Sequence, residues 1–527
     1  MVALDAQLNG PPSKLDVAGT LRVDDVHRWD LLPKRGGGWS VGYKGTLDLR
    51  SERLEIASTS DAPNPQLGLK FRAEGLLSTP HWEAAAEMNK VPLATLVEVA
   101  RHMGAALSEK LAAEGSVSGR VQYSEPAGLD GHVELQDASV TLPDVPPLHA
   151  AAASVAIGGR KFSLEAATVK IGDDEAADVE GSFETGAGLD VRITTRSLNV
   201  ADLRSFGLTS IPVVEQTPQG SWRGWARYHW RSGEKGEWTG EYELQNARIA
   251  IDGFAAPLRI QSAAVSCNSG RVAVSRMRAR LGEIALTGEY RWDPTATRPH
   301  RFKVSIPNAD AVELQALLAP ALVRERGFLA RTLRLGPAPV PEWLASRRAD
   351  GTLSIDVLNV GDTAVRLDSA RVLWDGAQIR LVHLNAHADQ AAASGDLEIN
   401  LANRVPHYRF DGKFSDLAYK GGRVDLDGSF ESDGTGADLI AEARAQGSLR
   451  GRSIAFSPDA EFRTVAACFE MSPPLKLKIS CLEVTQAGET FTGSGATQGD
   501  GRLVLDLTGR GRLLHYTSAL LAGSSLP

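Results

Sequence analysis

The stretch Gly351-Thr-Leu-Ser-Ile-Asp-Val357 alternates apolar and polar side chains at every second residue. Successive side chains of a β-strand point to opposite faces, so Leu353, Ile355 and Val357 are expected on one face of a strand. The same alternation returns further along the chain, with these apolar members: Leu397, Ile399, Leu401, Val424 and Leu426. One apolar and one polar face is typical of an antiparallel sheet that is covered on one side only.

Asp-Gly dipeptides stand among these alternating runs and are common in tight hairpin turns. They are Asp130-Gly131, Asp252-Gly253, Asp350-Gly351, Asp375-Gly376, Asp411-Gly412 and Asp427-Gly428. Together the two signals predict an all-β fold. We expect an elongated, curved, mostly antiparallel repeat sheet with an apolar concave groove and a few short helices.

A strand pattern followed by a helical pattern recurs along the chain. It starts at Asn89, Asn199 and Asn308, with a fainter echo at Ser415, so the spacings are 110, 109 and 107 residues. A period of this kind predicts stacked units, each with about eight to ten short strands and one short helix. The helices are expected near 92–103, 200–206 and 310–333.

The repeats predict the organisation of the chain. Residues 1–104 form an incomplete first repeat, 105–207 the second, 208–318 the third, and 349–527 a C-terminal β region. Between them, residues 319–348 form a helical, Pro- and Arg-rich insertion. This basic segment could touch an anionic membrane surface. The alternative, which we favour, is a helix that caps the rim of the sheet.

Composition excludes some classes of function. The 527 residues carry a net charge of -8, and no block of clustered Lys and Arg occurs. Nucleic-acid binding is therefore not expected, because phosphate backbones require clustered positive charge. No signal peptide and no transmembrane run is recognisable. Either the chain is cytoplasmic, or a targeting segment lies upstream and is missing.

Two of the three cysteines flank a turn candidate. A hairpin centred just after Pro474 sets Cys468 opposite Cys481, within reach of a disulfide. The same register sets Ile479 against Glu470, and a slip of one residue would place the thiols on opposite faces. A disulfide and three unpaired thiols therefore stay as alternatives.

Catalytic motifs are largely missing. His383 and His387 have the i, i+4 spacing of a metal-binding helix, but in a strand four residues span about 13 Å, too far for one metal ion. The acidic run Asp173-Asp174-Glu175 is expected to be an exposed turn. We therefore predict no catalytic residues, no metal, no cofactor and no enzymatic activity, although distant carboxylates could still meet in a β-repeat fold.

Several segments resemble the AsmA-like family of bacterial envelope proteins. They include Tyr408-Arg-Phe-Asp-Gly-Lys-Phe414, the run from Gly421 to Ser432, and the run from Gly434 to Gly451. The strand-to-helix segments at 89, 199 and 308 are similar to the segments at the ends of the family's repeats. The resemblance implies a periplasmic protein, anchored to the inner membrane by an N-terminal helix that this chain does not contain. It also implies a role in outer-membrane biogenesis and phospholipid movement.

A long sheet with one apolar face and few helices to cover it is expected to leave a groove. Acyl chains of a phospholipid or another lipid suit such a groove, because each buried methylene contributes about 0.8 kcal/mol. The groove candidates are Leu353, Ile355, Val357, Leu397, Ile399, Leu401, Val424 and Leu426. Solvent is expected to face Thr352, Ser354, Asp356, Glu398, Asn400 and Asp425.

Two other functions stay open at this point. The first is an assembly factor that offers strand edges or the groove to outer-membrane proteins by β-augmentation. The second is a polysaccharide enzyme on a β-solenoid. Lipid extraction separates a lipid carrier from an assembly factor, and a cluster of facing carboxylates would support the enzyme.

Overall fold

The computed structural model describes residues 2–519, apart from 12, 24–38, 60–65, 103–107, 109, 143–145, 172–174, 202–216, 218, 323–339, 404, 437, 458–459 and 500. Strands make up about 73% of the chain and helices about 7%. The described strands form one open sheet of 30 strands, almost all antiparallel. The predicted all-β fold class is therefore confirmed. The expected helix over 202–206, the expected helix over 323–333 and the acidic turn at Asp173-Asp174 lie outside the described residues.

The strands are long, and a helical segment follows each group of six among the first twenty-four. The first group is β1 (Val2–Asn9), β2 (Leu15–Val23), β3 (Trp39–Asp48), β4 (Arg53–Ser58), β5 (Leu67–Glu74) and β6 (His81–Pro92), followed by α1 (Leu93–His102). The second group is β7 (Ala112–Ser124), β8 (Gly128–Thr141), β9 (Leu148–Gly158), β10 (Lys161–Ile171), β11 (Glu175–Glu184) and β12 (Gly188–Asn199), followed by helical residues 200–201. The third group is β13 (Gln219–Arg231), β14 (Glu237–Ile249), β15 (Leu258–Asn268), β16 (Arg271–Leu281), β17 (Ile284–Trp292) and β18 (His300–Asp310), followed by α3 (Ala311–Leu322) and α5 (Glu342–Ala345).

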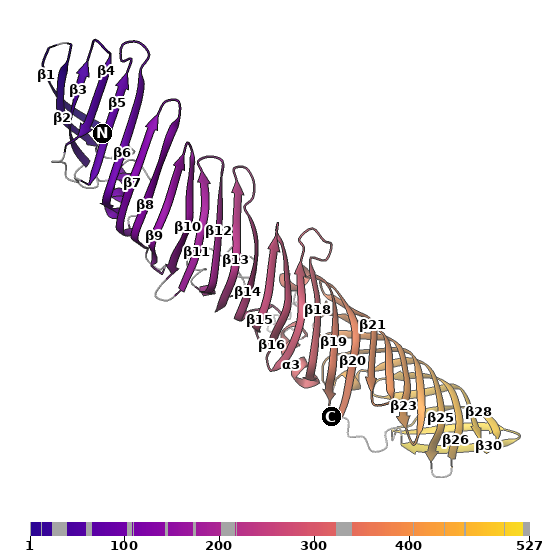
Figure 1. Ribbon diagram of the computed structural model, residues 1–527. Helices are drawn as coiled ribbons and strands as arrows, with labels where there is room; N and C mark the ends of the chain where they lie inside the picture. The colour runs from indigo at the N-terminus through magenta and orange to yellow at the C-terminus, as the bar shows by residue number, and fades with distance from the viewer. Residues whose placement is uncertain are drawn as a thin grey trace, which may run out of the picture. The chain divides into compact units, whose positions relative to one another are not determined.

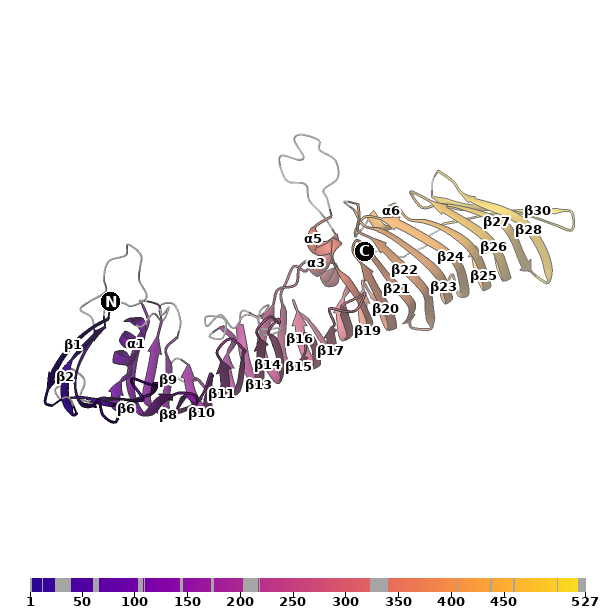
Figure 2. The same cartoon turned by 90° about the horizontal axis from the view of Figure 1, so that it is seen from above.

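The remaining strands continue in the same way. The fourth group is β19 (Arg348–Val360), β20 (Thr363–Asp375), β21 (Gln378–Ala388), β22 (Ala391–Asn400), β23 (His407–Tyr419) and β24 (Gly422–Asp433), followed by α6 (Asp438–Ala441). The last group is β25 (Arg444–Ser457), β26 (Ala460–Ser472), β27 (Lys476–Gln486), β28 (Glu489–Thr497), β29 (Arg502–Gly509) and β30 (Arg512–Ala519). Figure 1 shows consecutive strands lying side by side, and Figure 2 shows the same strands from above.

The repeat signal found in the sequence has a structural counterpart, with two corrections. Six strands rather than eight to ten precede each helical segment, because most strands are about twice the usual length of five to six residues. The echo at Ser415 is also wrong, since Ser415 lies inside β23 and the fourth helix follows β24. A glycine lies near the start of the first strand of each later group: Gly115 in β7, Gly220 in β13, Gly351 in β19 and Gly447 in β25.

Contacts between residues divide the chain into two compact units. The first unit is Met1–Gln245 with Ser266–Gly270, and the second is Asn246–Val265 with Arg271–Pro527. The domain limits drawn from the sequence repeats stay a prediction.

The strands β18 and β19 form a parallel pair, whereas the other described pairings are antiparallel. A parallel pair needs a crossover connection, and residues 311–347 supply it, including α3 and α5. Leu317 of α3 lies against Gly282, in the turn between β16 and β17. Trp343 of α5 lies against Gly253, in the turn between β14 and β15. These two helices therefore pack against turns at a rim of the sheet. Residues 323–339, which carry four of the insertion's arginines, lie outside the described residues, so the choice between a rim cap and membrane contact stays a prediction.

Four of the six Asp-Gly dipeptides are not turns. Those at 130, 350, 411 and 427 lie inside strands, and only those at 252 and 375 lead into connections. In the second unit Gly395, Gly412, Gly428 and Gly447 stand in one row across four strands. A Cβ atom at Gly412 would collide with the carbonyl oxygen of Ser394 and with the Phe410 ring. These glycines serve close packing in the sheet, which a sequence reading cannot distinguish from a turn.

Extra residues bend several strands near their middle. In β21 the residues between Leu381 and Leu384 form such a β-bulge, and His383 adopts a φ of 56° there. The amide of His383 donates a hydrogen bond of 2.8 Å to Oδ1 of Asp396 on β22. The amide of Asp416, in a bulge of β23, donates in the same way to Asp425 at 2.9 Å. A short acidic side chain thus satisfies the amide that each bulge removes from the ladder.

We expect Asp396→Ala to weaken the β21–β22 pairing by about 1 kcal/mol, because a backbone amide loses a charged acceptor. Hydrogen exchange of peptides covering 378–400 measures the effect. Asp396→Asn, which retains an acceptor oxygen, is the matched control and should lose less than half as much. Equal protection in the Asp396→Ala protein and the parent would contradict this role.

The β26–β27 hairpin is centred on Pro474 and not just after it, which shifts the pairing partners by one residue, so Cys468 pairs with Ser480 rather than with Cys481. A bulge at Ser480 and Cys481 then brings Cys481 back beside Cys468. The two sulfurs are bonded, and the Cα atoms lie 5.4 Å apart. The observed register also sets Glu470 opposite Lys478, which removes the mismatch of charged and apolar residues. The register prediction was wrong, and the bulge allows the bond despite the slip.

Candidate functional site

An uncharged surface covers the apolar face of β21–β24 in the second unit. Strand pairing sets its side chains in four rows that cross the strands. The rows are Ile379, Ile399 and Tyr408; Leu381, Leu397, Phe410 and Phe430; Leu384, Gly395, Gly412 and Gly428; and Ala386, Ala393, Phe414 and Leu426. Each of these residues is half-buried. We call this set the open patch, since it is apolar and yet accessible.

Phenylalanine rings pack against one another in the part of the open patch on β23 and β24. The ring centroids of Phe414 lie 5.3 Å from those of Phe410 and Phe430. Phe430 in turn lies 6.2 Å from Phe469 on β26. Aromatic pairs at these distances attract each other beyond the effect of area burial. The Phe410 ring also lies against the backbone of Gly395 and Gly412.

Seven of the eight groove residues predicted from the sequence lie on the apolar face, and they differ in how far they are buried. Leu397, Ile399 and Leu426 belong to the open patch, and Leu353 is half-buried on the same face. The residues that are buried by surrounding protein on this face are Ile355, Leu401 and Val424. The predicted solvent residues Thr352 and Asp356 are exposed, while Ser354, Glu398, Asn400 and Asp425 are partly covered.

Val357 is the exception, and its assignment to the groove is corrected. An irregularity in β19 between Ile355 and Leu358 shifts the alternation by one residue. Leu358 therefore continues the apolar face, whereas Val357 pairs with Asn308 and is 40% exposed. A period-two argument fails wherever a bulge intervenes.

Beyond the open patch the apolar face closes on itself. A cluster from β25–β29 is almost completely buried, and includes Phe456, Phe462, Leu482, Val484 and Leu507. The ring of Phe462 on β26 lies 5.9 Å from that of Tyr516 on β30. Four strand spacings in a flat sheet would separate them by roughly 19 Å. The sheet therefore curls toward its apolar side here, and we call this cluster the closed end.

A rim cluster borders the same apolar face near β20. The guanidinium of Arg347 lies between two tryptophans, 5.2 Å from the Trp343 ring and 5.0 Å from the Trp374 ring. It donates a hydrogen bond of 3.2 Å to the carbonyl oxygen of Asp252. Tyr290 and His300 lie nearby and share a hydrogen bond of 2.8 Å between the phenol oxygen and Nδ1. We call these five side chains, Trp343, Arg347, Trp374, Tyr290 and His300, the rim cluster.

The titratable groups of the rim cluster are perturbed. Burial, with a smaller contribution from Arg347, holds the pKa of His300 below its usual value. Burial raises the pKa of Tyr290 to about 12. The pKa of Arg347 is lowered, also by burial. His300 is therefore mostly neutral and Tyr290 protonated near pH 7, so Arg347 supplies the positive charge.

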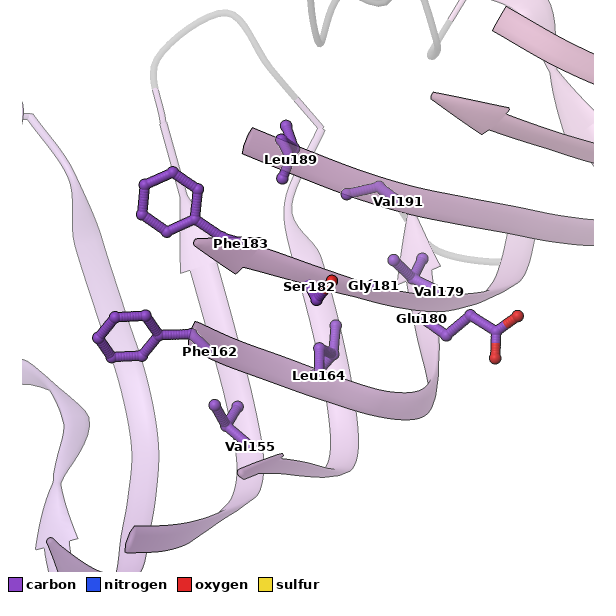
Figure 3. Close-up of a pocket in the computed structure, with 10 residues that line it drawn as sticks. All are labelled: Val155, Phe162, Leu164, Val179, Glu180, Gly181, Ser182, Phe183, Leu189 and Val191. Atoms are coloured by element: carbon purple, nitrogen blue, oxygen red, sulfur yellow. The ribbon is translucent and has the colours of Figure 1, made fainter. Parts of the chain in front are cut away.

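The first unit has an apolar hollow of its own, with a volume of about 190 Å³. Figure 3 shows Phe162 and Phe183 standing side by side at one end, and their rings lie 6.5 Å apart. Leu164 and Val191 flank Gly181, whose missing side chain leaves the hollow open. An engineered cavity of roughly 150 Å³ is large enough to bind benzene, so this hollow could take part of a hydrocarbon chain.

Other reactive groups give little support to catalysis. Burial raises the pKa of the Cys267 thiol to about 11, so a thiolate nucleophile is disfavoured. Within the described ranges no three His, Cys, Asp or Glu side chains gather as metal ligands. None of the described helices is long and apolar enough to cross a bilayer.

No family model matches this chain, no curated protein matches it, and no solved structure matches it. The AsmA-like resemblance therefore stays a hypothesis that rests on the sequence segments alone.

Sequence reasoning did not single out the aromatic part of the open patch or the rim cluster. A signal for the first was present, because Tyr408, Phe410, Gly412 and Phe414 alternate strictly within β23. The rim cluster gave no comparable signal. It combines residues from β17, β18, β20, α5 and the residues before β19, which only the fold brings together.

Proposed function

We propose that this protein binds the acyl chains of phospholipids or similar lipids on its apolar sheet face, as a component of the bacterial envelope. The observation that carries the proposal is the open patch, which has no charged member and is half-buried throughout. A surface with few hydrogen-bonding groups favours hydrocarbon over a peptide, whose backbone would need polar partners. Each methylene that leaves water for the patch contributes about 0.8 kcal/mol.

A periplasmic location is part of this proposal. The disulfide between Cys468 and Cys481 supports it, because such bonds persist in oxidising compartments. The resemblance to the AsmA-like family adds a possible setting, in which a segment outside this chain anchors the protein to the inner membrane. In that setting the protein shields or conducts phospholipid acyl chains between the inner and outer membranes.

Lipid extraction and mass spectrometry of the purified protein test the proposal directly. We expect co-purifying phospholipid in stoichiometric amount. If the protein instead carries outer-membrane protein segments and no lipid, the assembly-factor function replaces this one.

Ile399→Asp is expected to reduce bound phospholipid roughly tenfold, the equivalent of about 1.4 kcal/mol, because it places a charge in the hydrocarbon path. The variant should fold, since Ile399 is only half-buried. Native mass spectrometry measures the occupancy. Asn400→Asp adds the same charge one residue later, on the opposite face of the strand, and should retain the lipid. Equal occupancy in the Ile399→Asp protein and the parent would rule out acyl binding at this patch.

A further inference from the structure

The rim cluster and the open patch meet at Trp374. The indole of Trp374 stands on the apolar face, and Trp374 pairs directly with Ile379 in the first row of the open patch. The guanidinium of Arg347 lies over the same indole, 5.0 Å from the ring centroid. A cation therefore borders an uncharged hydrocarbon surface, with an aromatic side chain between them.

Arg347 has the chemistry of an anion receptor. It donates a hydrogen bond to the backbone carbonyl oxygen of Asp252, and the Asp252 carboxylate interacts with it electrostatically. Tyr290 and His300 add two polar groups on the same face. A guanidinium, a phenol and an imidazole together can bind the oxygens of a phosphate group.

The distance from the rim cluster to Phe430 is of the same order as one lipid tail. Trp374 on β20 and Phe430 on β24 are four strand spacings apart, or roughly 19 Å. One leaflet of a bilayer holds its acyl chains within about half of the 30 Å hydrocarbon core, or roughly 15 Å. At the far side the Phe430 ring lies 6.2 Å from that of Phe469 on β26, and β25–β29 carry the buried cluster of the closed end.

We propose that the rim cluster binds the phosphate headgroup of a single phospholipid, whose acyl chain crosses β21–β24 and ends against Phe469. This inference rests on the proposed function, since it assigns a polar end to the same acyl site. Arg347 receives the phosphate, and the two tryptophans hold the guanidinium in place. In this unit the open patch is then a binding site for one lipid, next to the buried residues of the closed end.

Headgroup selection in native mass spectrometry tests the assignment. The parent protein is offered an equal mixture of dipalmitoyl phosphatidylglycerol and dipalmitoyl glycerol in detergent, which differ only in the phosphate headgroup. We expect the parent to prefer the phospholipid about tenfold, and Arg347→Gln to abolish the preference while still binding dipalmitoyl glycerol. Arg347→Lys should restore much of it. Arg371→Gln is the matched control, because Arg371 lies on the opposite face of β20, paired with Asp350 at 2.7 Å.

Photocrosslinking adds a readout that needs no substitution. A phospholipid with a diazirine on its headgroup should label peptides that contain Trp343 and Arg347. The same lipid with a diazirine at the terminal carbon should label peptides that contain Phe430 and Phe469. Excess inorganic phosphate should displace neither label.

The outcomes distinguish a failure of the headgroup site from a failure of the proposed acyl-binding function. If the parent binds neither lipid, the proposed function itself fails. If lipid binds but Arg347→Gln retains the phospholipid preference, or the headgroup label falls elsewhere, the headgroup site is wrong and the acyl site stands. Displacement of the headgroup label by inorganic phosphate would overturn the lipid assignment in favour of a free-phosphate site.

Discussion

Phe462→Ala is expected to lower the free energy of unfolding of the closed end by about 3–5 kcal/mol. The Phe462 side chain is 1% exposed and contacts the rings of Phe456 and Tyr516, each at 5.9 Å. Its removal leaves a cavity where the curled sheet has no second layer to close the gap. Because β26 is joined to β30 through these rings, the substitution should also allow the curl to open.

Hydrogen exchange of peptides from β26–β30, measured across a denaturant series, reports this local free energy without requiring a single transition of the whole chain. Leu513→Ala is the control, because Leu513 is 75% exposed on β30 and should change the value by less than about 0.5 kcal/mol. A loss below about 1 kcal/mol in the Phe462→Ala protein would mean that the closed end is not a packed core.

The paired substitution Cys468→Ser and Cys481→Ser is expected to cost the β26–β27 region about 3 kcal/mol. The bond closes a loop with a sequence separation of 13 residues, and a loop of about this length loses that much conformational freedom in the unfolded chain. The midpoint of denaturant unfolding, followed by exchange in β26 and β27, measures the loss.

Chemical reduction provides the matched comparison. The parent protein treated with dithiothreitol should reach the same midpoint as the double serine variant, while the variant itself should not respond to the reagent. Identical midpoints for the oxidised parent and the variant would show that the bond adds no stability. Cys267 should not interfere, since its thiol is buried in β15, remote in sequence from the pair.

The closed end changes how an acyl-binding role can be pictured. Sequence periodicity suggested one groove lined alike from end to end. In the second unit the half-buried open patch is followed by the buried cluster of β25–β29, so the apolar face is not equally accessible along its length. Under the proposed function, lipids therefore enter and leave this unit across the edge formed by the strand ends, where headgroups can remain in water.

Some features could be read from the chain because they depend only on local geometry. Alternation at 353–355, 397–401 and 424–426 predicted strands and their apolar sides, since every strand turns successive side chains to opposite faces. The helices α1 and α3 were also predicted to within a few residues of their starts. These conclusions needed no knowledge of neighbouring strands.

Other features were decided by the tertiary structure alone. A bulge in β19 turned Val357 to solvent, and another in β27 rescued the disulfide after the hairpin register had slipped. Asp-Gly at 411 and 427 became strand interior, because glycine allows neighbouring backbones to approach. The closed end and the rim cluster join residues from strands far apart in sequence. Register, bulges and curl depend on which strands pair. The free energy of that pairing comes from contacts between segments far apart in sequence, so no single segment determines it.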